Sequence, residues 1–444
     1  MKKTLVIRNK IEKFKISSIS VPGDKSLSIR FVILASLSNG RCKAKNILRS
    51  EDVMSAIKIL KNLGIKININ KKLCEVYGNG LNGYKFKKNL ILDSGNSGTT
   101  ARLMIAALIK SNHNIKIIGD KSLNKRDMKR IIDPLKKFGL KFKKNNGKLP
   151  LVIKGSNILK PIKYYEKLGS AQCKSAVMIG ALNVEGKTKL ICLPSRNHSE
   201  IMFKNVLKLP IKIKKNKNFD EIEIEGKKEF KAFNYKVPGD ISSASFFIVL
   251  TLLSKKSNLI IRNVNVNPTR TGIIKILNLM GAKIKLLNKK IYKGEHTADL
   301  FVTSANKLKS INLDPKLNST AIDEFLLLFL VAGLSKGIST FRGLDELNKK
   351  ESKRLDWGYK ILKLIGIKVK KFKNSGIKIW GNPDLILDQT YIIKDYLKDH
   401  RIFMLSVIAA TSLGGKWIIH DPESFETSFP TFLMSIKKLG AKIN

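Results

Sequence analysis

The sequence predicts an α/β (α+β) protein of two domains, each built from three similar units. At 444 residues the chain is too long for one ordinary hydrophobic core. One sequence pattern returns six times and accounts for the whole length. A Val-Pro-Gly-Asp turn occurs twice, where the first and the fourth of these units begin.

Each repeat contains an apolar, helix-like segment that ends in a bulky residue followed by glycine, a small or apolar residue, lysine and another apolar residue. Glycine after the last turn favours a left-handed helix cap, and the alternation that follows is typical of a strand. Copies lie at 63–67, 138–142, 280–284, 365–369 and 439–443, with a weaker one at 207–212; second strands are expected at 72–77, 149–154, 221–225, 299–303 and 376–380. A period of about 70 to 85 residues suits βαβ-type units better than a solenoid of short repeats.

The two turns differ in charge. The first, 21–24, ends a run of alternating apolar residues and leads through Lys25, Ser26, Ser28 and Arg30 into an expected helix at 31–37. Free N–H groups at a helix start favour an anion, and lysine and arginine suit phosphate or carboxylate. The second copy, 237–243, lacks the basic residues.

The positions of the two turns predict the domain boundaries. Residues 22–237 form an N-terminal domain, and residues 1–21 join 238–444 in a C-terminal domain. The chain then crosses between domains at both turns, and we expect the charged turn to lie in the cleft.

The formal net charge of +51 raises the possibility of a nucleic-acid-binding protein. The excess is nearly all lysine, however, and it is scattered through every segment. No arginine-rich helix, basic groove interleaved with aromatic residues or zinc-finger spacing is present, so specific nucleic-acid binding is disfavoured. Attraction of small polyanions fits better.

Other global features indicate a cytoplasmic protein. No stretch approaches the length of a membrane span, and the N-terminus lacks the features of a signal peptide. The four cysteines have no metal-binding spacing, so we expect reduced thiols and no metal site.

One motif of the N-terminal half resembles an anion cradle, and others place basic or polar groups near helix starts, with ordinary turns and an exposed basic loop as the alternatives. Residues 93–102 form a glycine- and hydroxyl-rich turn with Arg102, before an expected helix at 103–109. Arg126 lies in a basic loop near another helix start, and 169–175 precede a helix at 176–182. Arg196 and His198 lie in a capping-box-like segment, where the histidine could cap a helix, lie at the surface or be functional.

The C-terminal half adds carboxylates to further cations. Asp323 lies beside an intensely apolar run, as a helix N-cap or as a base with a raised pKa. Lys350, Glu351 and Arg354 fall within about one helical turn. Arg401 precedes a helical run at 402–410. Surface ion pairs are the alternative for each cluster, but together the two halves suit two anionic substrates closed between domains, with acid/base groups against them.

Taken in order over nearly the full length, these motifs resemble those of the 5-enolpyruvylshikimate-3-phosphate synthases. The resemblance is carried by residues 23–30, 95–99, 170–172, 267–272, 350–354, 399–401 and 427–430. It implies a two-domain inverse α/β barrel of six βαβαββ repeats. It also implies transfer of the enolpyruvyl group of phosphoenolpyruvate to the 5-hydroxyl of shikimate 3-phosphate, with release of phosphate, by a monomer without metal or organic cofactor.

The resemblance also implies roles for individual residues. The expected contacts of shikimate 3-phosphate are Lys25, Ser26, Arg30, Ser170, Ala171, Gln172, Arg196, Asp323 and Lys350. Those of phosphoenolpyruvate are Lys25, Asn96, Gly98, Arg126, Gln172, Arg354 and Arg401. Asp323 would take the proton of the 5-hydroxyl, Glu351 would exchange the proton at the vinyl carbon, and Lys25 would serve as the acid near the leaving phosphate.

Two positions depart from the family pattern. Lys353 stands where aspartate is usual, which bears on the support of Arg354, and Thr427 stands where many members have lysine. Gly98 lacks the side chain that some herbicide-tolerant members carry, so the resemblance implies sensitivity to glyphosate. The rival within the fold, a UDP-N-acetylglucosamine enolpyruvyltransferase, fits less well because residues 119–128 contain no cysteine.

Overall fold

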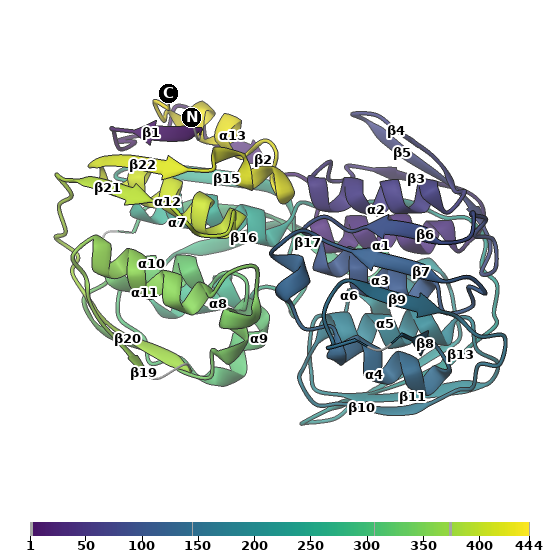
Figure 1. Cartoon of the computed structure of the whole chain (residues 1–444). Coiled ribbons are helices and arrows are strands. Elements are labelled where there is room, and N and C mark those ends of the chain that lie inside the picture. The colour runs from purple at the N-terminus through teal and green to yellow at the C-terminus, as the bar shows by residue number, and fades with distance from the viewer. Residues whose placement is uncertain (1–2, 144, 306, 373–374, 444) are drawn as a thin grey trace. The chain divides into compact units, whose positions relative to one another are not determined.

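The chain folds into two compact units, in a computed structural model that describes residues 3–143, 145–305, 307–372 and 375–443 (Figure 1). The C-terminal unit comprises Met1–Pro22, Pro238–Ile291 and His296–Asn444, and the N-terminal unit comprises Gly23–Val237 and Tyr292–Glu295. The short segment Tyr292–Glu295, at the tip of a hairpin, belongs to the N-terminal unit, which the sequence did not indicate.

The N-terminal unit contains three four-stranded sheets with one common plan. Their orders are β14-β3-β5-β4, β6-β7-β9-β8 and β10-β11-β13-β12. In each sheet the first pair is parallel and the other two pairs are antiparallel. The strands are β3 (Asn39–Lys45), β4 (Lys66–Ile69), β5 (Leu73–Asn79), β6 (Leu90–Asp93), β7 (Ile115–Ile118), β8 (Lys141–Phe142), β9 (Leu151–Lys154), β10 (Lys163–Glu166), β11 (Lys187–Cys192), β12 (Ile211–Lys215), β13 (Asp220–Glu225) and β14 (Asn234–Lys236).

The C-terminal unit has a related plan with one four-stranded sheet and two three-stranded sheets. Their orders are β16-β17-β15-β2, β18-β20-β19 and β1-β22-β21. The strands are β1 (Thr4–Ile7), β2 (Ser18–Ser20), β15 (Asn258–Asn265), β16 (Ile284–Tyr292), β17 (Glu295–Thr303), β18 (Gly337–Phe341), β19 (Lys368–Phe372), β20 (Gly376–Gly381), β21 (Thr390–Ile393) and β22 (Lys416–His420). In the last sheet β1 pairs antiparallel with β22, and Ile443 bridges to Ile7.

Three helices of each unit lie inside the ring of sheets, as Figure 1 shows. In the N-terminal unit they are α1 (Lys25–Ser36), α3 (Gly98–Ala107) and α5 (Ala171–Ala181), and in the C-terminal unit α7 (Ile241–Leu253), α10 (Phe325–Gly333) and α12 (His400–Leu413). Nearly every residue of these helices is buried. A helix that is apolar on all sides has to be surrounded by protein, so the expected inverse α/β barrel of six repeats is confirmed.

The remaining helices are α2 (Glu51–Asn62), α4 (Lys129–Phe138), α6 (His198–Ile201), α8 (Gly272–Leu279), α9 (Asn318–Ala321), α11 (Arg354–Leu364) and α13 (Phe432–Leu439), with short helices η1 (Leu123–Lys125), η2 (Met202–Val206), η3 (Pro315–Leu317), η4 (Asp345–Lys349) and η5 (Pro422–Thr427). Of these, α2, α4 and α11 pack against the buried helices α1, α5 and α10. None of the helices in the described ranges is long and apolar enough to cross a membrane.

The repeated glycines adopt the left-handed conformation expected of helix caps. Their φ angles are +82° at Gly64, +118° at Gly139, +95° at Gly281, +84° at Gly366 and +122° at Gly440. In the weaker copy Lys208 takes this conformation instead, with a φ of +57°. A lysine bears the strain there because the packed helix and hairpin on either side fix the turn.

The two Val-Pro-Gly-Asp turns connect strands and helices of different units. Strand β2 pairs in parallel with β15 of the C-terminal unit, whereas β14 pairs in parallel with β3 of the N-terminal unit. The glycines allow close approach: a Cβ at Gly23 would lie 2.0 Å from the Asn46 carbonyl oxygen, and one at Gly239 would lie 2.8 Å from Val21. The turns therefore accept no larger residue at these positions.

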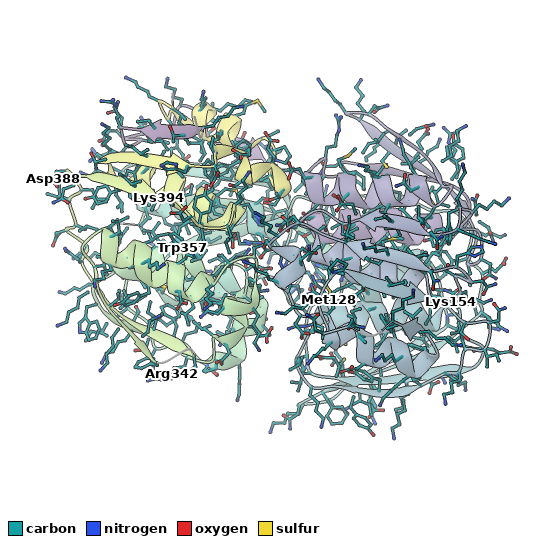
Figure 2. All side chains as sticks on the ribbon, in the orientation of Figure 1. Met128, Lys154, Arg342, Trp357, Asp388 and Lys394 are labelled. Carbon is teal, nitrogen blue, oxygen red and sulfur yellow. The ribbon has the colours of Figure 1, made fainter. Side chains whose placement is uncertain are left out.

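Many of the lysines that dominate the composition are exposed in both units, although Lys174 is buried. Lys154 and Lys394, labelled in Figure 2, are both exposed and belong to different units.

All four cysteines are buried and free, and burial raises the pKa of the Cys74, Cys173 and Cys192 thiols to about 12.

Candidate active site

The buried helices of the N-terminal unit begin with polar caps that the sequence only partly located. Asp24, Ser97 and Ser170 accept hydrogen bonds from backbone N–H groups in the first turns of α1, α3 and α5. These three helices begin five or six residues before the apolar runs that predicted them, so Lys25, Ser26 and Arg30 lie inside α1. The first turns of α3 and α5 hold Gly98, Ala171 and Gln172 in the same way.

Arg30 is buried and connects three helices of this unit. Its Nε donates to Ser199 Oγ at 2.9 Å, and one Nη donates to Ser175 Oγ at 2.8 Å. The other Nη donates to the Ser26 carbonyl oxygen at 3.1 Å. The guanidinium is therefore fixed one turn into α1 beside Ser26, in a position to meet an anion bound at that helix start.

Arg102 and Gln172 connect the first turns of α3 and α5. Arg102 Nη1 donates to Gln172 Oε1 at 2.6 Å, and the Gln172 amide donates to Thr99 Oγ1 at 2.9 Å. Arg102 also donates to the Asp127 carbonyl oxygen at 2.9 Å, which holds the loop before α4. Arg102 is a structural link between predicted site residues.

Arg126 and Asn96 lie together at the start of α3. Arg126 donates to Asn96 Oδ1 at 2.6 Å and to Ser122 Oγ at 3.2 Å, while the Asn96 amide donates to Asp120 at 2.6 Å. Gly98 is tightly enclosed by the guanidinium groups of Arg102 and Arg126. A Cβ at Gly98 would lie 2.7 Å from Arg102 Nη1 and 3.3 Å from Arg126 Nη1.

Lys25 has a carboxylate partner that the sequence did not indicate. Its Nζ lies 2.9 Å from Asp52 Oδ2, in the first turn of α2. Both side chains are mostly buried. In the sequence, the adjacent Glu51 and Asp52 after Ser50 could have indicated such a partner. Carboxylates are favoured in the first turn of many helices, however, so they did not point to Lys25.

Two predicted residues before α6 differ in their surroundings. Arg196 is half-buried in the segment that precedes this helix. His198 is neither a surface residue nor a cap: it is buried, and its Nδ1 lies 2.6 Å from Glu295 Oε1. The histidine therefore holds the Tyr292–Glu295 hairpin tip within the N-terminal unit.

The C-terminal unit brings Asp323, Lys350, Arg354 and Arg401 together. Asp323 Oδ1 lies 3.3 Å from Lys350 Nζ and 3.5 Å from Arg354 Nη1, and its Oδ2 lies 3.9 Å from Arg401 Nη2. Arg401 also donates to the Asp323 carbonyl oxygen at 2.8 Å. Asp323 does not cap α10, whose N-cap residue is Glu324 and has no side-chain cap bond.

Glu351 belongs to the same cluster. Its Oε2 accepts a hydrogen bond from Arg354 Nη2 at 2.5 Å. The expected single helical turn from Lys350 to Arg354 is wrong, because Lys350–Lys353 are irregular and α11 begins only at Arg354. The two carboxylates of Asp323 and Glu351 thus share one guanidinium.

Arg354 owes its position to Asp399, a partner that the sequence placed only in a motif. Its Nε donates to Asp399 Oδ2 at 2.9 Å, and Ser352 Oγ donates to the same oxygen at 2.9 Å. Burial is the largest single influence and raises the pKa of Asp399, but the charges of Arg354 and His400 and the hydrogen bond from Arg354 together outweigh it, so the pKa is lowered from its usual value. Lys353 is exposed, so the departure at this position leaves the Asp399 support of Arg354 in place.

Asp399→Asn is expected to lower the free energy of unfolding by about 3–5 kcal/mol, because the buried guanidinium of Arg354 loses its counter-charge. Because the folded-state pKa of Asp399 is lowered, its ionised form adds stability above the unfolded pKa of about 3.9, and that stability is lost as the pH falls through the folded pKa. Urea unfolding at several pH values measures both effects. Asp356→Asn, which breaks the half-exposed pair with Lys371, should cost less than about 1 kcal/mol. An equal loss of stability in the two variants would contradict the role of Asp399 as the buried counter-charge of Arg354.

Two further observations concern possible metal and ligand sites. Within the described ranges, no group of three or more histidine, cysteine, aspartate or glutamate side chains could hold a metal ion. A cavity of about 350 Å³ lies elsewhere in the N-terminal unit, and its lining includes Tyr84, Phe86 and His113 but none of the predicted site residues.

Buried helices with polar first turns, inside two rings of three sheets, define the enolpyruvyltransferase fold. An enolpyruvyl transferase from Streptomyces tendae shares this fold with a TM-score of 0.78 at 12% identity, and the match covers 100% of this chain and 99% of that chain. The family model of EPSP synthase (3-phosphoshikimate 1-carboxyvinyltransferase) matches residues 12–436. The chain belongs to the EPSP synthase family.

Individual relatives agree with this assignment. A 3-phosphoshikimate 1-carboxyvinyltransferase of Ruthia magnifica is 40% identical over 429 residues, 96% of both chains. One of Syntrophomonas wolfei is 41% identical over 419 residues, 93% of this chain and 95% of that one. EPSP synthase from Acinetobacter baumannii has a TM-score of 0.85 at 31% identity, with 100% of this chain and 99% of that chain covered. The chain is thus an enzyme with EPSP synthase activity, and a nucleic-acid-binding function is not favoured.

Proposed function

We propose that the two clusters described above are the substrate-binding and proton-transfer groups of 3-phosphoshikimate 1-carboxyvinyl transfer. The observation that carries this proposal is the pair of carboxylates on Arg354: Asp323 at 3.5 Å and Glu351 at 2.5 Å from its Nη atoms. Addition of a hydroxyl to a vinyl group followed by elimination needs two groups that each handle a proton. Two carboxylates fixed by one permanent cation meet this need.

Shikimate 3-phosphate binds at the starts of α1 and α5 in this proposal. Its phosphate takes hydrogen bonds from Ser26, Arg30, Ser170 and Arg196, helped by the partial positive charge at the starts of these helices. Ala171 contributes only backbone there. Lys25, Gln172, Asp323 and Lys350 contact the rest of the molecule.

Phosphoenolpyruvate binds to the residues grouped around Gly98 and Arg354. Arg126 and Asn96 are already hydrogen-bonded to each other at 2.6 Å, and Gly98 has no side chain that would displace Arg126. Lys25, Gln172, Arg354 and Arg401 complete the set. Arginines suit this ligand because a guanidinium can bind carboxylate or phosphate through two parallel hydrogen bonds.

The proposed chemistry runs in two steps. The 5-hydroxyl oxygen bonds to C2 of phosphoenolpyruvate while Asp323 takes the hydroxyl proton and Glu351 gives a proton to C3, which forms a tetrahedral ketal. The bond from C2 to the phosphate oxygen then breaks, Lys25 protonates the leaving phosphate, and Glu351 takes a proton back from the C3 methyl group. No other reactant is required.

Phosphate release tests the proposed function. The protein is mixed with shikimate 3-phosphate and phosphoenolpyruvate, and each substrate is omitted in turn. Release that requires both substrates supports the proposal. Release with a UDP-N-acetylglucosamine acceptor instead would favour the rival enzyme of the same fold, and no release with either acceptor from folded protein would overturn it.

Glyphosate is expected to inhibit the enzyme in competition with phosphoenolpyruvate. Gly98 carries no side chain, and a Cβ there would lie 2.7 Å from Arg102 Nη1 and 3.3 Å from Arg126 Nη1, so the glycine lets both guanidinium groups keep positions in which they can bind the inhibitor. Initial rates at several concentrations of both compounds should show an apparent KM for phosphoenolpyruvate that rises with glyphosate. Unchanged rates at high glyphosate concentration would contradict this expectation.

We further propose that the enzyme works as a monomer in the cytoplasm without a metal or organic cofactor. Light scattering should then give a mass near the 49.8 kDa of one chain. Treatment with EDTA followed by gel filtration should leave the rate of phosphate release unchanged. A dimer mass, or a rate restored only by added metal, would contradict these parts of the proposal.

A further inference from the structure

The second Val-Pro-Gly-Asp turn leads into a helix start that mirrors the first. Asp24 caps α1 and Asp240 caps α7, and each side chain accepts a hydrogen bond from the backbone of the first turn. Ser242 follows its cap by two residues, as Ser26 does in α1. In the repeat, α7 therefore has the helix start that binds the phosphate in our proposed function.

The second helix start differs from the first in its charged groups. Ile241 and Phe246 stand where α1 has Lys25 and Arg30, so α7 itself supplies no cation. A carboxylate of the protein is present instead: Ser242 Oγ donates to Glu324 Oε1. Arg270 supplies a cation, and its Nη2 lies 3.0 Å from Ser242 Oγ and 3.2 Å from Asp240 Oδ1.

Glu324 is unusual for a carboxylate next to a substrate-binding residue. Its side chain is fully buried at the start of the apolar helix α10, and its Oε2 has no hydrogen-bond partner among the described residues. Burying a carboxylate in such surroundings is costly unless nearby groups compensate its charge. Ser242, whose Oγ donates to Oε1, and Arg401 are the neighbouring groups that can offset this cost.

The carboxylate of Glu324 faces Arg401. Its Oε1 lies 3.8 Å from Arg401 Nη1, the atom that also donates to the Asp323 carbonyl oxygen at 2.8 Å. Glu324 thus connects the α7 start on one side with the guanidinium of Arg401 on the other. Its peptide neighbour Asp323 shares that guanidinium.

We propose that Glu324 is an internal anion that occupies the α7 helix start and acts as a positioning residue for Arg401. The first copy of the turn binds an anionic substrate, whereas the second copy binds a carboxylate of the protein and uses it to fix a substrate-binding arginine. The inference about Arg401 rests on the proposed function, in which Arg401 binds phosphoenolpyruvate. The inference that a carboxylate of the protein occupies the α7 start does not depend on the proposed function.

Steady-state kinetics of Glu324→Gln and Glu324→Ala test the positioning role. Both variants should raise the KM for phosphoenolpyruvate by about 10- to 100-fold, with the larger effect in the alanine variant, because Arg401 loses a charged neighbour. The KM for shikimate 3-phosphate should change less than threefold. Asp356→Ala, which removes a carboxylate paired with Lys371 in the same unit, is the control and should leave both values unchanged.

Formate distinguishes an internal anion from a merely structural side chain. In Glu324→Ala, sodium formate should raise the melting temperature and lower the KM for phosphoenolpyruvate at least about threefold, because it can replace the lost carboxylate at Ser242 and Arg401. Equal sodium chloride, and formate added to the wild type or to Asp356→Ala, should do neither.

The outcomes separate the two parts of the inference. Glu324→Ala with a wild-type KM for phosphoenolpyruvate would overturn the positioning role, and absence of any formate-specific rise in melting temperature would overturn the internal anion. Arg401→Lys tests the proposed function itself. If it leaves the KM for phosphoenolpyruvate unchanged, Arg401 does not bind this substrate, whereas the melting-temperature result still decides the internal anion.

Discussion

Glu351→Gln is expected to lower kcat by about 10²- to 10⁴-fold, the usual contribution of a positioned acid or base. Glutamine keeps the size of the side chain and an oxygen that can accept the 2.5 Å hydrogen bond from Arg354. It cannot exchange a proton with C3 of phosphoenolpyruvate. The KM values of both substrates should therefore change little, and phosphate release under saturating substrates measures the loss of kcat.

A second readout connects this loss to proton exchange at C3. With wild-type enzyme in D₂O, reversal of the first step should place deuterium at C3 of unreacted phosphoenolpyruvate, and mass spectrometry should detect none from Glu351→Gln. Glu346→Gln is the control, because this nearby glutamate pairs with Lys349 at the surface of η4. A Glu351→Gln variant with kcat within threefold of wild type would remove Glu351 from the mechanism.

Gly98→Ala is expected to raise the KM for phosphoenolpyruvate by about 10- to 100-fold, the loss of one charge-assisted contact. The new Cβ would lie 2.7 Å from Arg102 Nη1 and 3.3 Å from Arg126 Nη1, so one or both guanidinium groups have to shift. Arg126 is proposed to bind phosphoenolpyruvate, and Arg102 holds Gln172, which is proposed to contact both substrates. Resistance to glyphosate should rise with the KM.

Gly180→Ala provides the matched control in another buried helix. Its Cβ would meet only the side chains of Leu135 and Phe138, each at 3.3 Å, so it should alter stability without altering the KM of either substrate. Initial-rate kinetics and thermal unfolding of both variants distinguish a local effect on binding from a general loss of structure. A Gly98→Ala enzyme with wild-type KM values would show that the arginines are not in contact with phosphoenolpyruvate.

Apolar patterns predict that a helix is present better than they predict where it begins. The runs at 31–37 and 402–410 correctly predicted helices, but α1 begins at Lys25 and α12 at His400. A helix start is decided by which side chain caps it, here Asp24 and Asp399, and the polar first turn carries no apolar signal.

The same limit applies to the site, where the sequence predicted which residues take part but not which residues pair with them. Sequence motifs predicted Lys25, Arg354 and Arg401, but gave no indication of Asp52 as the partner of Lys25. Asp399 was part of a motif, yet its two hydrogen bonds to Arg354, across 45 residues, were not predicted. Such pairs are set by packing between elements and leave no local pattern.

The sequence by itself determined the repeated unit, its glycine caps and the residue types available for binding two anions. These properties depend on neighbouring residues, because periodicity and left-handed turns are local. Only the tertiary structure decided which charges meet: that Arg354 joins Asp323, Glu351 and Asp399, and that a second helix start holds the carboxylate of Glu324. Buried charges are stable only with partners, and those partners come from distant segments that the fold alone brings together.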